Sequence, residues 1–228
     1  MKLLLTSGGL MNKSMVAALQ KLAGKPFRNL NAIFIPTAAN AEKGDKWWLI
    51  KDLESAHKLK FKNLDIVDIA ALKPEWVKER VQDANIIFVG GGNTFYLSYW
   101  MQKSGLMNMF PELLKTRVYV GISAGSMAVT NSLRVSSQVL EKSNKLTDEE
   151  YDELGPKGQS SAKTARLVDF TIRPHLNSEW FPKIRLNYLS EIAKQIPETM
   201  YAIDDQTAIV VIDRKIEVIS EGVWKKFN

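Results

Sequence analysis

The stretch Tyr119-Val-Gly-Ile-Ser-Ala-Gly-Ser-Met127 decides the fold of this chain. An apolar run, Val118–Val120, leads into Gly-Ile-Ser-Ala-Gly and then into small residues that suit the start of a helix. This G-x-S-x-G pattern is typical of a nucleophile elbow, a sharp strand-to-helix turn that raises one serine hydroxyl above the sheet edge. The flanking glycines are needed because such a turn leaves no room for a side chain. The pattern predicts Ser123 as a nucleophile for acyl transfer; a glycine-rich turn with an incidental serine is the alternative.

A second glycine motif, Gly90-Gly-Gly-Asn-Thr-Phe95, follows the apolar run Asn85–Val89. A strand that leads through glycines to a helix N-terminus presents unpaired N–H groups, which suit an anion or an oxyanion. Asn93 is also a natural N-cap for the helix that follows. The motif is neither G-x-G-x-x-G nor a P-loop, so it does not favour a nucleotide site. In an acyl transfer, the N–H of Ala124 would also point at the oxyanion.

The surrounding sequence alternates strand-like apolar runs with amphipathic helical stretches, which is typical of a mostly parallel sheet covered on both faces. From Met200 the chain instead predicts antiparallel strands. We therefore expect an α/β fold and a single domain over residues 1–228. The expected strands are 2–6, 32–36, 64–69, 85–89, 118–120, 168–172, 207–212 and 216–219, and the expected helices are 12–22, 45–60, 74–81, 95–101 and 178–195.

The charge, hydrophobicity and cysteine content of the chain exclude several classes of function. The 228 residues carry a formal net charge of +6, but the lysines are scattered among acids and no nucleic-acid-binding module accompanies them. No apolar run reaches the roughly 18 residues that a membrane span needs. The absence of cysteine excludes disulfides, thiolate zinc sites and a cysteine nucleophile. We expect a cytoplasmic protein with no cofactor or metal, no nucleic-acid or membrane partner, and a monomeric or homodimeric state.

A serine nucleophile needs a base, and the chain has two histidines. His57 lies in a charged helical stretch and is expected at the surface. His175 follows a strand that ends at Pro174, and residues at the carboxyl ends of strands line the ligand crevice of open α/β sheets. We therefore expect His175 to be the general base. Asp204 and Asp205 lie between two apolar runs, and either could orient the histidine, because adjacent residues of an extended chain point in opposite directions.

The predicted catalytic order is serine, histidine, aspartate, whereas the α/β-hydrolases have serine, acid, histidine. The combination of Phe88-Val-Gly-Gly-Gly-Asn-Thr-Phe95, Gly121-Ile-Ser-Ala-Gly125 and Arg173-Pro-His175 resembles the S51 serine peptidases. That family includes the α-aspartyl dipeptidase called peptidase E and the cyanophycinases. The resemblance covers nearly the whole chain.

The resemblance implies a flavodoxin-like three-layer sandwich, related to class I glutamine amidotransferases, with a Ser-His-acid triad. Ser123 matches the family nucleophile and His175 the base. The family acid is usually Glu, so Asp205 is a shorter counterpart and Asp204 stays an alternative. The oxyanion hole would be formed by the N–H of Ala124 and that of Gly91 or Gly92.

Substrate specificity does not carry over with the triad. The position of the arginine that binds the substrate carboxylate in the aspartyl dipeptidases corresponds here to Pro182. Lys183 or Arg185 could substitute for that arginine, and Arg185 and Asn93 are the candidate substrate-binding residues. We expect a serine peptidase acting on short peptides, with weak or no α-aspartyl dipeptidase activity. The alternatives are a hydrolase of a non-peptide amide and a catalytically silent binding or sensor protein. The polar residues 141–165 could act as a lid.

Overall fold

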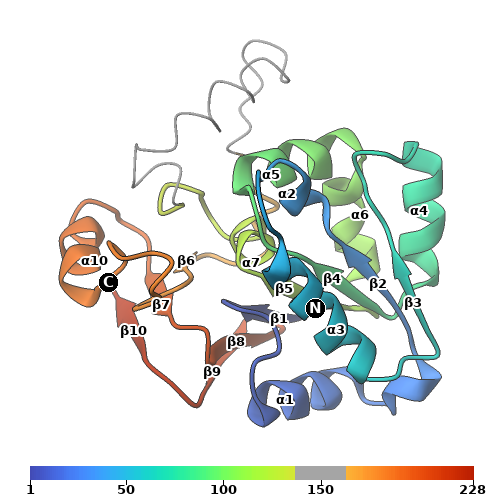
Figure 1. The fold of residues 1–228 in the computed structure, drawn as a ribbon, viewed down its shortest axis with the longest axis horizontal. Coiled ribbons are helices and arrows are strands. Elements are labelled where there is room, and N and C mark those ends of the chain that lie inside the picture. The colour runs from blue at the N-terminus through green and yellow to red at the C-terminus, as the bar shows by residue number, and fades with distance from the viewer. Residues whose placement is uncertain (137–162) are drawn as a thin grey trace.

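The computed structural model describes residues 1–136 and 163–228. Its centre is a seven-stranded sheet with the order β3-β2-β4-β5-β1-β8-β9 (Figure 1). The first five strands in this order are parallel neighbours, whereas β8 and β9 join antiparallel. The strands of this sheet are β1 (Lys2–Thr6), β2 (Asn31–Ile35), β3 (Asn63–Ile66), β4 (Ile86–Val89), β5 (Val118–Ile122), β8 (Thr207–Ile212) and β9 (Lys215–Ser220).

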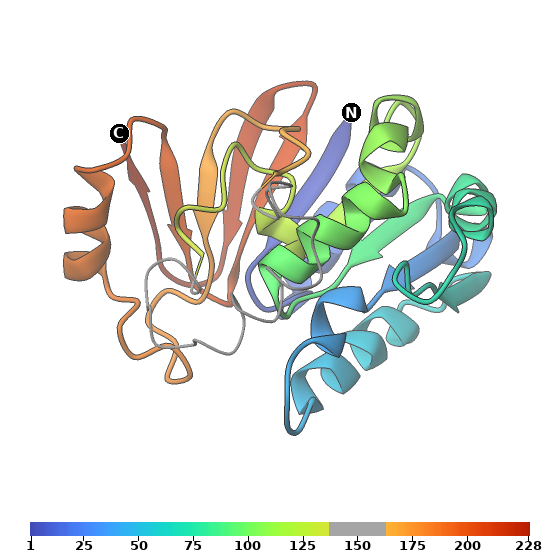
Figure 2. The same cartoon turned by 90° about the horizontal axis from the view of Figure 1, so that it is seen from above.

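Helices cover both faces of the sheet, so the molecule has three layers (Figure 2). The buried strands alternate between the two cores: in β1, Leu3 and Leu5 pack into one core and Leu4 into the other. The helices against the Leu4 side are α1 (Lys13–Ala23) and α3 (Trp47–Lys58). Those on the other side are α4 (Pro74–Asp83), α5 (Thr94–Lys103), α6 (Leu106–Leu113) and the single turn α7 (Ala124–Met127).

A second, three-stranded sheet extends the molecule beyond the β8–β9 end (Figures 1 and 2). It has the order β10-β7-β6 and consists of β6 (Thr171–Arg173), β7 (Met200–Ile203) and β10 (Trp224–Phe227). The strands β6 and β7 are parallel, and β10 is antiparallel to β7. Helix α10 (Leu186–Ala193) packs beside them through Leu189 and Ala193.

The strand register brings three distant segments to one edge of the central sheet. Thr6, the last residue of β1, lies opposite Ile122, the last residue of β5. It also lies opposite Ala208, near the start of the antiparallel strand β8. The residues just after β1 and β5 therefore meet those just before β8 at this edge.

The predicted fold class is confirmed: a mostly parallel α/β sheet with C-terminal antiparallel strands. Some boundaries were wrong. The helix predicted from Ser178 begins only at Leu186, because turns occupy the intervening residues. The strand predicted over 168–172 begins at Thr171. The short helix α2 (Thr37–Asn40), the helix α6 and the strand β10 were not predicted.

Two expectations about the organisation of the chain stay predictions. Residues 141–162 of the possible lid lie outside the described residues. The single-domain organisation also stays a prediction. Across the described ranges, we find no helix of the length and apolarity that a bilayer crossing requires.

Candidate active site

Ser123 lies on a sharp turn between β5 and α7. Its backbone has φ 48° and ψ −106°, an unusual conformation for a residue with a side chain. The turn closes tightly on both flanking glycines. A Cβ on Gly121 would lie 2.7 Å from the backbone of Ser126, and one on Gly125 would lie 2.0 Å from the carbonyl oxygen of Val89. Both glycines are therefore required sterically, as the G-x-S-x-G pattern predicts.

The structure brings the three predicted triad residues together. His175 Nε2 lies 2.9 Å from Ser123 Oγ, and His175 Nδ1 lies 2.8 Å from Asp205 Oδ1. Because a carboxylate only accepts hydrogen bonds, Nδ1 carries a proton; in the neutral imidazole, the lone pair of Nε2 then faces the serine hydroxyl. The ring of Phe181 stacks on the imidazole at a centroid distance of 4.7 Å. The histidine is thus held in the tautomer and orientation of a general base.

Asp204 and Asp205 have different surroundings. Asp204 Oδ1 accepts hydrogen bonds from the Gln206 amide and the Thr207 hydroxyl, while its Oδ2 accepts from the Val223 amide. These bonds tie the β7–β8 turn to the chain before β10. Asp205 instead faces His175, so the geometry favours it over Asp204 as the orienting acid.

Ser7 is a member of this cluster that the sequence did not single out. Its hydroxyl donates to Asp205 Oδ1 over 2.5 Å and accepts a hydrogen bond of 2.8 Å from the backbone N–H of His175. Ser7 lies directly after β1 and is fully buried. A serine in a Ser-Gly-Gly turn has no recognisable catalytic signature, so only the strand register could have revealed it.

Two carboxyl groups at this edge have opposite protonation behaviour. Burial alone would raise the pKa of Asp205, but the hydrogen bond and charge of His175, with the Ser7 hydroxyl, hold it below its usual value. Asp52, on α3, is also largely buried, and this raises its pKa to about 7; the charge of Lys51 opposes the shift and that of Asp205 adds to it. The Asp205 carboxylate is therefore charged at neutral pH, whereas Asp52 is partly protonated.

The second glycine motif lies beside the serine. A Cβ on Gly91 would lie 3.3 Å from the Cβ of Ser123, and Gly92 adopts φ +126° against the backbone of Ala38. Within residues 1–136 and 163–228, the backbone N–H groups of Gly91, Gly92 and Ala124 have no hydrogen-bond acceptor. Donors left unsatisfied next to a serine hydroxyl suit an oxyanion.

The two candidate substrate-binding residues also have structural contacts. Asn93 is fully buried, and its Oδ1 caps α5 by accepting from the amides of Phe95 and Tyr96. Its Nδ2 atom has no partner in the described part of the chain. Arg185 donates through Nη1 to the carbonyls of Ser178, Phe181 and Ile184 and so braces the turns after His175. A substrate role for either residue stays a prediction.

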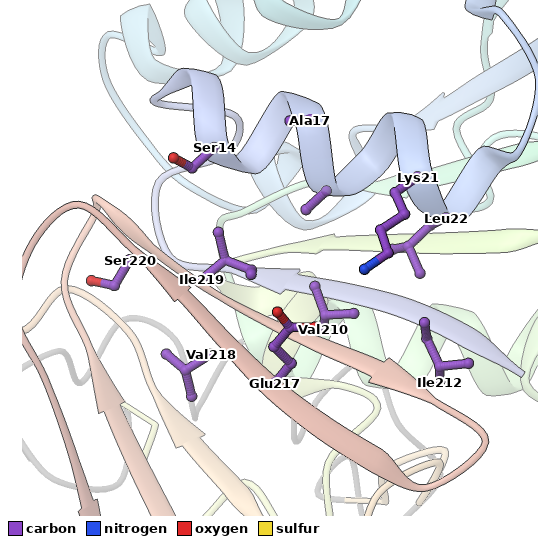
Figure 3. A pocket seen from close by; sticks show the side chains of 11 residues that line it. Ser14, Ala17, Lys21, Leu22, Val210, Ile212, Glu217, Val218, Ile219 and Ser220 are labelled. Atoms are coloured by element: carbon purple, nitrogen blue, oxygen red, sulfur yellow. The ribbon is translucent and has the colours of Figure 1, made fainter.

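The other candidates lie outside this cluster. His57 is exposed on α3, as expected. A groove of about 490 Å³ runs between α1 and the β8–β9 hairpin (Figure 3). Its titratable side chains are Lys21 and Glu217, and no nucleophile–base pair lines it. Among the described residues, no group of three or more acidic or histidine side chains could bind a metal. The chemistry therefore points to the Ser123 edge.

Several known proteins are similar to this chain in sequence. The sequence model of Peptidase family S51 matches residues 3–219. The uncharacterized peptidase Lin0382 of Listeria innocua is 28% identical over 189 residues, which cover 80% of this chain and 81% of the relative. The uncharacterized peptidase PM1590 of Pasteurella multocida is 22% identical, with 81% and 82% covered. A shorter match to Peptidase E of Shewanella oneidensis reaches 36% identity over 63 residues, 27% of each chain.

Two solved structures share the fold. A Listeria monocytogenes protein provisionally named as a peptidase E superposes with a TM-score of 0.77 at 21% identity, covering 97% of this chain and 98% of that one. A peptidase from an acI-B1 Actinobacterium gives a TM-score of 0.60 at 19% identity, with 99% and 93% covered. At these identities, the likeness extends to the fold alone.

Proposed function

Because the chain belongs to peptidase family S51 and is a serine peptidase of the peptidase E type, we propose that it cleaves short peptides through a Ser123–His175–Asp205 triad. The contact that carries this proposal is the 2.9 Å approach of His175 Nε2 to Ser123 Oγ. It is combined with a carboxylate on the other ring nitrogen, so nucleophile, base and orienting acid stand in line.

In the first step, His175 Nε2 takes the proton of Ser123 while Oγ attacks the carbonyl carbon of the scissile amide. The imidazolium that forms is stabilised by Asp205, which remains a carboxylate. Negative charge develops on the substrate oxygen, and the N–H groups of Ala124 and of Gly91 or Gly92 would donate to it.

In the second step, the tetrahedral intermediate collapses and the C–N bond breaks. His175 gives its proton to the departing amine, and the acyl group stays on Ser123 as an ester. A water molecule, deprotonated by the same nitrogen, then attacks the ester. The acid product leaves, and the proton returns to the serine oxygen.

The proposed substrate is a short peptide without a strict requirement for aspartate. The resemblance implies that Pro182 takes the position of the specificity arginine of the aspartyl dipeptidases, and proline has no charge to bind a carboxylate. One guanidinium nitrogen of Arg185 is already engaged by three carbonyls. Both observations support weak α-aspartyl dipeptidase activity.

The test is hydrolysis of a mixed dipeptide and tripeptide library, followed by mass spectrometry, together with labelling by a fluorophosphonate probe. Ser123→Ala and His175→Ala should both abolish cleavage and labelling. The second histidine gives a matched control: His57→Ala, at an exposed position of α3, should retain both activities. Cleavage that survives in Ser123→Ala would reject the triad, and efficient hydrolysis of Asp-X dipeptides would reject the proposed specificity.

A further inference from the structure

We propose that Ser7 is a positioning residue that holds the acid and the base of the triad in register through one hydroxyl group. This inference rests on the proposed function, because it assigns a role within that site. Ser7 does not face the substrate carbonyl; it acts through Asp205 and His175.

The first support is the number and direction of its hydrogen bonds. The Ser7 hydroxyl donates to Asp205 Oδ1 and accepts from the backbone N–H of His175. Its oxygen also lies 3.3 Å from His175 Nδ1. The Ser7 oxygen therefore contacts the Asp205 carboxylate, the backbone N–H of His175 and the ring nitrogen of His175 that faces Asp205. Ser7 itself is fully buried, so these bonds are shielded from water on its side, whereas the Asp205 side chain is 35% exposed.

The second support is that both partners need an external constraint. His175 has φ +63°, a left-handed conformation that is unfavourable for a residue with a Cβ. The bond from its backbone N–H to Ser7 stabilises the main chain at that point. Asp205 stands on a turn between β7 and β8 that Asp204 closes, and Asn12 holds the same turn by donating to the carbonyl of Gln206. These bonds do not reach the Asp205 carboxylate, which the Ser7 hydroxyl couples to the end of β1.

The third support is the residue that follows. A Cβ on Gly8 would lie 3.0 Å from the Cβ of Asp205, so a side chain here would press on the acid. The absence of that Cβ lets the short aspartate approach closely enough to reach the imidazole. Together, Gly8 leaves the space and Ser7 supplies the hydrogen bond that an aspartate at position 205 requires.

The experiment measures phosphonylation of Ser123 by a fluorophosphonate probe in the full chain, with the maximal rate and the probe affinity determined separately from pH 5 to 9. In Ser7→Ala we expect the maximal rate to fall about 10- to 100-fold, since small misplacements of catalytic groups have effects of this size. The probe affinity should change less than about threefold, because Ser7 does not contact the bound molecule.

The pH profile separates positioning from general support of the fold. Without the Ser7 donor, more of the Asp205 charge is available to the imidazolium, so the acid limb of the profile should move to higher pH. Thr130→Val is the matched control: this buried threonine hydroxyl donates 2.7 Å to the carbonyl of Met127, away from the triad. It should leave both the rate and the acid limb unchanged.

If Ser7→Ala does not fold, Ser7→Cys replaces it, because a thiol is nearly isosteric but a weak donor. It should give the same rate loss and the same direction of shift. Wild-type rate and an unshifted acid limb in a folded variant would overturn the role of Ser7 while leaving the triad intact. Failure of the unsubstituted protein to react at all would instead contradict the proposed function.

Discussion

The buried carboxyl group of Asp52 makes the stability of this protein depend on pH. Asp52 lies on α3 and its carboxyl group packs against Gly9. A Cβ on Gly9 would lie only 2.6 Å from Asp52 Oδ1. Burial is the main cause of its raised pKa; Lys51 opposes the shift and the Asp205 carboxylate adds to it. The folded state therefore binds a proton that the unfolded chain releases at lower pH.

The sign and size of the effect follow from this difference. In the unfolded chain the Asp52 carboxyl has its ordinary pKa of 3.8, whereas in the folded protein its pKa is about 7. Between these values the unfolded state is the more ionised, so the free energy of unfolding falls as pH rises and levels off above pH 7. Three pKa units correspond to about 4 kcal/mol, of which about 3 kcal/mol lies between pH 5 and pH 8.

Asp52→Asn removes the titration while keeping the shape of the side chain. We expect urea unfolding to show the variant more stable at pH 8, with an advantage that shrinks by about 3 kcal/mol on going down to pH 5. Asp83→Asn, which removes an exposed carboxylate on α4, controls for the change in net charge. A stability difference between Asp52→Asn and the unsubstituted protein that stays constant across this pH range would refute the reasoning.

Five further substitutions, which make three tests, examine the surroundings of the site. Gly125→Ala should lower the free energy of unfolding by about 3 kcal/mol or more, because its Cβ would meet a carbonyl of β4. Gly24→Ala is the control: its Cβ would lie in open space, so it should lose only about 1 kcal/mol. Equal losses in urea unfolding would be inconsistent with this reasoning. Asp205→Ala should reduce kcat by about 10³-fold or more with little change in stability. Asp204→Ala should destabilise the fold by about 2 kcal/mol, while the activity per folded molecule persists. The reverse pattern would exchange the roles of the two aspartates. Tyr119→Phe, which deletes a buried hydroxyl bonded to the carbonyl of the elbow glycine, should reduce stability by about 1 kcal/mol in thermal or urea unfolding, and no loss would show that this bond contributes nothing.

Local patterns were sufficient for much of the central sheet. The buried runs that became β1, β2, β4 and β8 are short, apolar and bounded by turn residues, so their type does not depend on distant partners. The helix α1 carries both of its end signals: Asn12 caps its first turn, and Gly24 ends it with φ +68°. The elbow was predictable for the same reason, because the close contacts of Gly121 and Gly125 are imposed within a few residues.

Segments that depend on tertiary contacts were not predictable in this way. The sequence from Ser178 onward has helical spacing, yet it forms turns that Arg185 braces through three carbonyls. The strand β10 is largely exposed and contains Lys225 and Lys226, so it lacks the apolar signal of a strand. It forms because β7 offers an antiparallel partner. In β10, pairing with a neighbouring strand therefore outweighs the low strand propensity of its lysines.

The candidate site shows the same division between local and distant information. Ser123 and His175 could be predicted from the sequence around them, a G-x-S-x-G motif and the end of a strand. The choice between Asp204 and Asp205 instead depends on the directions of their side chains across a turn. Ser7 and Asp52 could not be found at all from the sequence, because each acquires its surroundings from elements that are far away along the chain. For Ser7 the partners are 168 and 198 residues away.

This dispersal explains why the antiparallel strand β8 matters for the proposed chemistry. Parallel strands present their carboxyl ends at one sheet edge, so β1 and β5 deliver Ser7 and Ser123 there without further adjustment. An acid that precedes a strand reaches the same edge only if that strand runs the opposite way, as β8 does beside β1. The pairing of Asp205 with His175 has a separate origin: β6 and β7 are parallel, with Arg173 opposite Ala202, so the two side chains follow neighbouring strand ends. Any change that displaced β8 from β1 should therefore move Asp205 and His175 together away from Ser123, while leaving the elbow itself intact.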